Sequence, residues 1–160
     1  MTVRVSDRPL SVGEQAPDFT LRDQHGQDVT LSDTQGQKAT VLMFYPFAFS
    51  GVCTGELCGV RDDLGSYDNA GVRLLAISCD PVYSLRAFAD RDGLFFPLLS
   101  DFWPHGAVSS AYGVFNADRG CSNRSTFIVD KAGLVHWSVH NAMPDARDLG
   151  EQVRVLSELR

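Results

Sequence analysis

The sequence predicts an α/β fold in which a mixed central sheet is covered by helices on both faces. In the first two thirds of the chain, strand-like apolar runs alternate with helix-like segments, which favours parallel strands joined by right-handed crossovers. Near the C-terminus two strand-like segments are separated only by a tight turn, which adds antiparallel strands. A chain of 160 residues that is 44% hydrophobic and 21% charged has a globular composition. We expect one domain spanning residues 1–160.

The N-terminal half is expected to contain a hairpin, two buried strands and the helix that connects them. The hairpin alternates apolar and polar residues on either side of a turn at His25 and Gly26. The first buried strand is a continuous β-prone apolar run, and in the helix after it apolar residues recur at spacings of three and four. The expected elements are a loosely held lead-in over 1–12, hairpin strands at 19–21 and 29–31, a strand over 38–45, a helix over 50–67 and a strand over 72–78.

The C-terminal half is expected to contain three helices and three strands. Pro81 is placed to open a helix, because proline fits the first helical turn. A turn over 130–133 joins the last two strands, and the terminal helix turns apolar residues such as Leu149 and Leu156 inward. The expected elements are a helix over 81–91, a strand over 96–99, a helix over 104–112, strands over 125–129 and 134–140, and a helix over 145–160.

The charge balance and the lack of long apolar runs argue against several classes of function. The 14 Lys and Arg residues against 20 Asp and Glu give a formal net charge of −6, whereas a nucleic acid or an anionic membrane would require a basic face. No run approaches the ~20 apolar residues of a membrane helix, and the first residues lack the apolar core of a secretory signal. We expect a cytoplasmic protein with no nucleic-acid or membrane partner, whose four cysteines are free thiols.

One stretch, from Pro46 to Cys58, combines residues that could make a cysteine reactive. Pro46 cannot donate a ladder hydrogen bond, so it forces the chain out of the preceding strand. Ser50 suits the N-cap of the next helix, which places Cys53 in the first turn. Unpaired N–H groups and the positive end of the helix dipole favour an anion there, and the thiolate is the nucleophilic form of cysteine. Cys53 is therefore the candidate nucleophile.

These residues fit the pattern of a known family. Pro46, Ser50 and Cys53 match the form Pro-x-x-x-Thr/Ser-x-x-Cys, and Arg124 precedes a strand that reads Ser-Thr-Phe-Ile-Val-Asp. The sequence thus resembles the peroxiredoxins, and within them the alkyl hydroperoxide reductase E branch. The resemblance implies a thioredoxin-like (peroxiredoxin) fold. The other segments that carry it are residues 13–21, 76–81, 96–108 and 111–115.

The resemblance implies a thiol-dependent peroxidase that reduces hydrogen peroxide and organic hydroperoxides. The Cys53 thiolate would attack a peroxide oxygen and become a sulfenic acid. The Ser50 hydroxyl, the Arg124 guanidinium and nearby backbone N–H groups would stabilise the charge that develops on the oxygens. Arg124 would also keep the thiolate ionised, and Pro46 would shield the site and shape the loop.

Several other residues near this motif are given different roles. Phe47 and Phe49 are expected to wall the pocket and exclude water. Glu56 would oppose thiolate formation if it pointed inward, so we expect it to complement the helix dipole or to pair with an arginine, and not to be catalytic. His136 and His140 share a strand face but lack a third ligand at the spacing of a metal site. We expect no metal and no cofactor.

A second thiol must attack the sulfenic acid, and the sequence leaves its identity open. The spacing of Cys58 from Cys53 is similar to that of peroxiredoxins that resolve within one subunit. Cα atoms five residues apart on a helix lie ~8.7 Å from each other, beyond the ~4.4–6.8 Å of a disulfide, so the helix would have to unwind over residues 50–60. Cys121 or an external thiol are the alternatives, and Cys79 is expected in the core.

The expected partners are a peroxide, a reducing partner and a second copy of the chain. The resemblance implies reduction by a mycoredoxin with mycothiol, or by thioredoxin, and a homodimer that pairs near the active site. Phe102 and Trp103 could form an exposed aromatic ridge, and core packing is an equal alternative for each. The alternative function is a redox-sensing interaction protein, in which oxidation of Cys53 remodels residues 50–60 to signal a partner.

Overall fold

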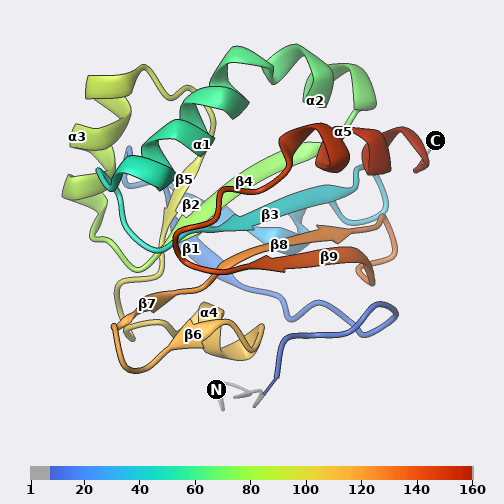
Figure 1. Cartoon of the computed structure of the whole chain (residues 1–160). Helices are drawn as coiled ribbons and strands as arrows, with labels where there is room; N and C mark the ends of the chain where they lie inside the picture. The colour runs from blue at the N-terminus through green and yellow to red at the C-terminus, as the bar shows by residue number, and fades with distance from the viewer. Residues whose placement is uncertain (1–7, 160) are drawn as a thin grey trace.

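A seven-stranded sheet forms the centre of the molecule (Figure 1). The computed structural model describes residues 8–159. The strand order is β2-β1-β5-β4-β3-β8-β9, and β6 pairs with β7 in a separate two-stranded sheet. The strands are β1 (Thr20–Arg22), β2 (Asp28–Thr30), β3 (Thr40–Phe44), β4 (Arg73–Ser78), β5 (Leu98–Ser100), β6 (Phe115–Asn116), β7 (Cys121–Ser122), β8 (Arg124–Val129) and β9 (Val135–Asn141).

The strand directions confirm the predicted mixed sheet. β4 runs parallel to both β3 and β5, as expected for strands linked by helical crossovers. β8 runs antiparallel to β3 and β9, and β1 runs antiparallel to β2 and β5, so both predicted hairpins are present. The register pairs Phe44 of β3 with Ser125 of β8. The end of β3 therefore lies beside the start of β8.

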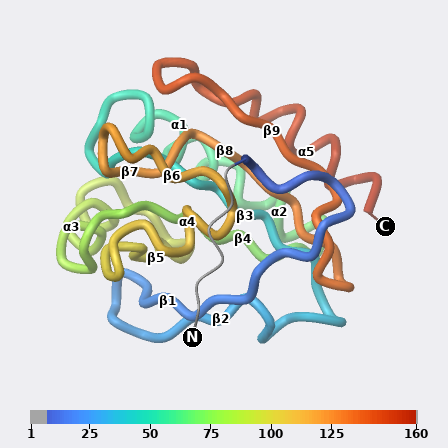
Figure 2. Tube along the Cα trace, turned by 90° about the horizontal axis from the view of Figure 1, so that it is seen from below, coloured from blue at the N-terminus to red at the C-terminus, as the bar shows by residue number. Residues whose placement is uncertain are grey.

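Helices lie on both faces of the sheet, as predicted, although unequally. α1, α2 and α5 lie above the sheet in Figure 1, whereas α4 and the blue N-terminal segment cross the opposite face, seen from below in Figure 2. None of the described helices is both long and apolar enough to pass through a bilayer. The helices are α1 (Gly51–Asp62), α2 (Leu64–Ala70), α3 (Val82–Asp92), α4 (Ala107–Ala111), α5 (Leu149–Ser157) and the short 3-10 helix η1 (Leu31–Thr34).

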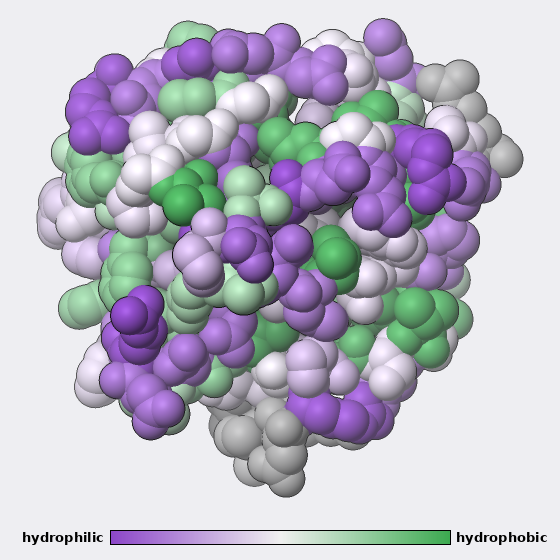
Figure 3. Space-filling view, in the orientation of Figure 1, coloured by the Kyte–Doolittle hydropathy of each residue, from purple (hydrophilic) through white to green (hydrophobic). Residues whose placement is uncertain are grey.

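Two apolar clusters, one on each face, hold the helices to the sheet. All five side chains of β3 are buried, and successive strand residues point to opposite faces. Val41 and Met43 therefore join the cluster that contains residues of α1 and α5, whereas Leu42 and Phe44 join the cluster that contains α4. Burying one such side chain contributes roughly 1.5–3 kcal/mol. On the outside, hydrophobic and hydrophilic residues are intermixed over the face drawn in Figure 3.

Three predicted helices have different boundaries in the structure. The helix expected over 50–67 breaks at Asp63, whose ψ of 25° ends α1 before α2 begins. The helix expected over 104–112 begins only at Ala107, because Gly106 before it has a left-handed φ of 72°. The helix expected over 145–160 begins after Asp148, whose carboxylate accepts a bond from the Glu151 N–H and caps α5. Arg160 lies outside the described residues.

The N-terminal segment is held more firmly than predicted where the structure describes it. Leu10 is buried, and its N–H donates to the carbonyl of Tyr112 at 3.2 Å. Part of the lead-in expected over 1–12 therefore packs against the sheet, and residues 1–7 lie outside the described residues. The small sheet of β6 and β7 was not predicted, because strands of two residues carry no alternating pattern.

Candidate active site

The candidate active-site loop begins where β3 ends. The Tyr45 N–H still bonds to β4 at 3.0 Å, and the buried Pro46 then leaves the sheet. Ser50 is the N-cap of α1, as predicted, and its carbonyl accepts from the Thr54 N–H at 2.8 Å. Its hydroxyl makes no capping bond. The Ser50 side chain therefore keeps its hydrogen-bonding capacity for another partner.

Cys53 and Arg124, 71 residues apart in the sequence, meet inside the protein. Cys53 lies in the first turn of α1 and is fully buried. Arg124 is the first residue of β8, and its Nη2 donates to the Cys53 Sγ at 3.4 Å. The Nε and Nη2 atoms of the same guanidinium also donate to the carbonyl of Met143, at 3.1 and 2.8 Å. These bonds fix the cation against the sulfur, where a positive charge favours the thiolate.

Glu56 joins Cys53 and Arg124 in a buried charge network. One carboxylate oxygen of Glu56 accepts from Arg124 Nη1, and the other accepts from the N–H and Nε of Arg147, at 2.8 and 2.9 Å. Arg147 is buried as well and donates to the Phe44 carbonyl at 2.6 Å. Burial lowers the pKa of Arg147, and the nearby Glu56 opposes this effect. The prediction that Glu56 pairs with an arginine is confirmed, and it pairs with two.

The formal charges of this network depend on the state of Cys53. Two guanidinium groups and one carboxylate sum to +1 when the thiol is neutral, and to zero when it is ionised. A buried charge without a counterion is costly. One anion beside Arg124 would bring the sum of these buried charges to zero.

Arg147 and Met143 were not identified from the sequence. Both precede α5 in a stretch that was expected to be partly helical, and neither belongs to the motif around Cys53. The sequence feature related to Arg147 was Glu56, which was expected to complement the helix dipole or to pair with an arginine. That expectation does not say which arginine supplies the charge.

A pocket of about 170 Å³ lies next to Arg124, although the buried Cys53 does not itself line it. Arg124 both borders the pocket and contacts the Cys53 sulfur, so it links the opening to the thiol. The pocket brings together three of the residues selected from the motif, Pro46, Ser50 and Arg124. The residues that line it are Pro46, Phe47, Ser50, Gly51, Val52, Arg119, Arg124 and Met143.

Phe47 lines this pocket as expected, whereas Phe49 does not. The ring of Phe49 packs on Phe88 of α3, with 5.1 Å between ring centroids. The guanidinium carbon of Arg91 lies 4.8 Å from the centroid of the Phe49 ring. The expectation that Phe49 walls the pocket is therefore wrong. Its backbone has a left-handed φ of 69°, and its ring lies against α3 and not in the pocket. Phe49 instead joins the loop to α3.

The other three cysteines differ in their surroundings. Cys58 is half-buried on the unbroken helix α1, five positions after Cys53, and all four thiols are free. Cys79 is buried, as predicted, and burial raises its pKa to about 11. Burial also raises the pKa of Cys121. Of the candidates for a resolving thiol, Cys58 is thus the one with partial access to solvent.

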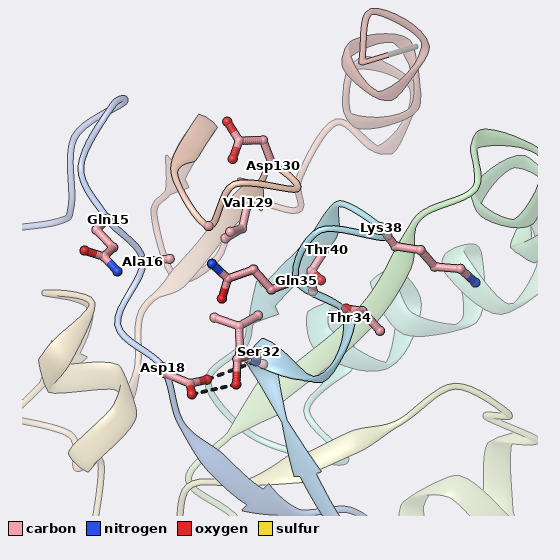
Figure 4. A pocket seen from close by; sticks show the side chains of 12 residues that line it. Gln15, Ala16, Asp18, Ser32, Thr34, Gln35, Lys38, Thr40, Val129 and Asp130 are labelled. Carbon is pink, nitrogen blue, oxygen red and sulfur yellow. Dashed lines mark hydrogen bonds between the residues drawn. The ribbon is translucent and has the colours of Figure 1, made fainter.

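A second pocket, drawn in Figure 4, lies at the far end of β3 from Cys53. It is bordered by Thr40, the first residue of β3, and by Val129, the last residue of β8. Asp18 on its rim bonds to the N–H and hydroxyl of Ser32, at 3.0 and 2.8 Å, as the dashed lines show. Its polar groups serve local turns and it contains no cysteine, so it is not the reactive site.

Comparison with known proteins places the chain in a family. A model described as the AhpC/TSA family matches residues 12–138. Alkyl hydroperoxide reductase E of Mycobacterium tuberculosis is 50% identical over 139 residues, which are 87% of this chain and 91% of that protein. These matches favour the peroxidase interpretation over the redox-sensing alternative.

Solved structures of peroxiredoxins share the fold. The crystal structure of peroxidoxin BcpB from Mycobacterium tuberculosis matches with a TM-score of 0.84 and 30% identity, over 93% of this chain and 97% of that one. The reduced 2-Cys peroxiredoxin of Plasmodium vivax matches with a TM-score of 0.84 and 28% identity, over 93% and 81% of the two chains. The chain therefore belongs to the AhpC/TSA family, as a thioredoxin-like peroxiredoxin of the alkyl hydroperoxide reductase E type, and it is a thiol-dependent peroxidase.

Proposed function

We propose that Cys53 is the attacking thiolate for hydrogen peroxide and organic hydroperoxides, within a single domain formed by residues 1–160. The sulfur forms a bond to one peroxide oxygen while the O–O bond breaks. Cys53 is oxidised by two electrons to a sulfenic acid, and the peroxide leaves as water or an alcohol after taking up a proton. The observation that carries this proposal is the 3.4 Å contact between the Arg124 guanidinium and the Cys53 sulfur.

The proposed roles of the neighbouring residues follow from where they lie. Ser50 and Arg124 both border the pocket, so their donors can act on the two oxygens that gain charge as the O–O bond breaks. Donors fixed in advance are more effective than water, because they need no reorganisation during the reaction. Pro46 acts by shape alone: it is buried at the strand end and keeps the loop over the thiol.

We infer that the sulfenic acid is resolved by Cys58 or by an external thiol. Cys58 is half-buried, whereas Cys79 and Cys121 are buried thiols with raised pKa values. A bond between Cys53 and Cys58 requires the first turns of α1 to unwind. Gly51, Gly55 and Gly59 favour unwinding, since each glycine costs helix stability. If amide exchange over 50–60 is equally protected in the reduced and oxidised protein, this local unwinding does not occur.

The proposed external partner is a reductant that carries a thiol. A thiol reductant regenerates Cys53, either a mycoredoxin with mycothiol or thioredoxin. A cytoplasmic location follows from the expected reducing compartment, and no nucleic-acid or membrane partner is proposed. Turnover of peroxide with each purified reductant identifies the partner, since only the correct one supports many cycles.

We also propose a homodimer that pairs near the active site. Tyr83 and Trp103 are more than four fifths exposed, and with Phe102 they border an open groove beside the start of α3. The expectation of an exposed aromatic ridge at Phe102 and Trp103 fits their exposure. Sedimentation of the native protein and of Trp103→Ser tests the pairing. A monomer at all concentrations in the native protein excludes it.

Stopped-flow peroxide consumption with excess reductant tests the catalytic assignment. The native protein should complete many cycles, whereas a pure redox sensor would complete about one. Cys53→Ser should abolish consumption, and Cys58→Ser should alter only recycling. Full activity in Cys53→Ser would overturn the assignment, and mass spectrometry of the oxidised native protein distinguishes a sulfenic acid from an internal disulfide.

A further inference from the structure

The mouth of the active-site pocket carries a cation that the peroxidase reaction with hydrogen peroxide does not require. Arg119 borders the pocket together with the apolar side chains of Phe47, Val52 and Met143. It is exposed, and within residues 8–159 it forms no ion pair. The deeper Arg124 already donates to Glu56, to Cys53 and to the Met143 carbonyl. Arg119 is thus the guanidinium of the pocket that remains available to a ligand.

The backbone that carries Arg119 is fixed at the pocket mouth. Arg119 lies in the turn between β6 and β7, and its N–H donates to the side-chain oxygen of Asn116 at 3.0 Å. The Gly120 N–H donates to the Asn116 carbonyl at 2.8 Å, and the Gly120 carbonyl lies 2.7 Å from Nε2 of His105. The turn is therefore tied both to its own sheet and to the segment before α4. The backbone of Arg119 is therefore fixed, and its side chain borders the pocket.

Arg119 interacts electrostatically with one buried thiol, that of Cys121. Arg119 partly opposes the burial that raises the pKa of Cys121, and Cys121 in turn interacts electrostatically with Cys53. The chain as a whole has a net charge of −6, which repels an anionic substrate from most of the surface. The positive charge of Arg119 would instead attract an anionic substrate to the pocket.

We propose that Arg119 is a specificity-determining residue that selects organic hydroperoxides bearing a carboxylate. This inference rests on the proposed role of Cys53. The carboxylate pairs with Arg119 at the mouth, the carbon skeleton lies against Phe47 and Met143, and the hydroperoxide group points toward Arg124. The pocket of about 170 Å³ is open to solvent, so it would take only the part of such a molecule that lies nearest Arg124. The reaction is unchanged: sulfur bonds to one oxygen, the O–O bond breaks and the alkoxide takes a proton from water.

The test compares two hydroperoxides that differ by one carboxylate group. Cumene hydroperoxide and its para-carboxylate are each mixed with the reduced Cys58→Ser protein at low salt, and the sulfenic acid is trapped with dimedone and counted by mass spectrometry. The ratio of the two rate constants, carboxylate over neutral, should be about fivefold higher with Arg119 present than in Arg119→Gln. Arg119→Lys should retain most of the ratio, and Arg119→Glu should reverse it.

Two controls isolate the role of the charge at the mouth. Arg154→Gln removes an exposed arginine from α5, with a side chain 62% exposed, and should keep the native ratio. Raising the salt concentration should lower the ratio in the native protein without any substitution, because exposed charges are screened. Equal ratios in the native protein and Arg119→Gln, with no salt dependence, overturn the inference. Absence of sulfenic acid with either substrate would instead overturn the proposed role of Cys53.

Discussion

The residues around Cys53 form a buried group whose net charge depends on one proton. Arg124 and Arg147 each contribute a positive charge, and Glu56 bridges them with its two oxygens. Without Glu56 two like charges would be buried side by side. With it, the buried group lacks one negative charge, and the proposed thiolate would supply that charge. The network would then have two roles, since it connects the ends of β3 and β8 and would favour the reactive form of Cys53.

Replacing Arg124 should affect the reaction more than any other single change outside Cys53. Arg124→Gln keeps a donor near the sulfur but removes the charge, so the rate of Cys53 oxidation should fall by about 10²–10³. Stopped-flow measurement with hydrogen peroxide gives this rate, and alkylation of Cys53 by iodoacetamide reports the thiolate separately. Arg154→Gln is the matched surface control. A loss smaller than tenfold would mean that Arg124 is not the main donor.

Replacing Arg147 should mainly affect stability. Its guanidinium donates to the Phe44 and Ser125 carbonyls and to the Thr126 hydroxyl, in addition to Glu56. Arg147→Met would leave these acceptors without their donor, and breaking a buried pair costs about 3–5 kcal/mol. Urea denaturation measures the loss. Arg154→Met, at an exposed site, should change the free energy of unfolding by less than about 0.5 kcal/mol, and an equal loss in both variants would contradict the prediction.

Among the elements, α1 and the loop before it carry opposing requirements. In the proposed cycle the loop holds Cys53 against Arg124 for the first step, yet α1 must unwind if Cys58 is to reach Cys53 for the second. Phe49 adopts a left-handed backbone that costs a non-glycine residue about 1–3 kcal/mol. Its ring contacts with Phe88 and Arg91 offset this strain. The folded loop is thus held to α3 by the side-chain contacts of Phe49.

Weakening the Phe49 contacts should speed disulfide formation. Phe49→Leu keeps the backbone strain but removes the ring contacts, each worth about 1 kcal/mol, so the Cys53–Cys58 bond should form roughly tenfold faster after oxidation. Quenched-flow mass spectrometry follows the bond. Phe95→Leu, at an exposed position after α3, is the control. If amide protection over 50–60 falls in Phe49→Leu while the rate of disulfide formation stays the same, unwinding is not the limiting step.

The elements that the sequence predicted well are those with a strong apolar pattern. β3 and β4 are buried on both faces and appear as continuous apolar runs, so they could be located. The break at Asp63 and the two-residue strands β6 and β7 could not be located. Neither changes the spacing of apolar residues over a stretch long enough to be recognised. These short features nevertheless matter, since the turn between β6 and β7 places Arg119 at the pocket.

At the scale of the whole molecule, the site is assembled by the sheet from distant segments. The register of β3 with β8 brings Arg124 to the end of the strand before Cys53, and the segment after β9 returns Met143 and Arg147 to the same edge. Cys53, Ser50, Pro46 and Arg124 could be selected beforehand because a family motif marks them. Met143, Arg147 and Arg119 could not, because only the folded chain brings them there.

The stability of the whole molecule should decline in alkaline solution partly through Cys79, which follows β4 at this same edge. In the folded protein burial raises the pKa of this thiol from 9.0 to about 11, whereas the unfolded chain keeps the ordinary value. Between these pH values the folded state binds more protons than the unfolded state, so stability falls as pH rises. Cys79 should account for about 2 kcal/mol of loss between pH 8.5 and 10.5. Urea denaturation at both pH values measures the free energy of unfolding. Between the two pH values this free energy should fall by about 2 kcal/mol less in Cys79→Ala than in the native protein. Equal losses in the two proteins would contradict the prediction and would mean that the thiol is in contact with water.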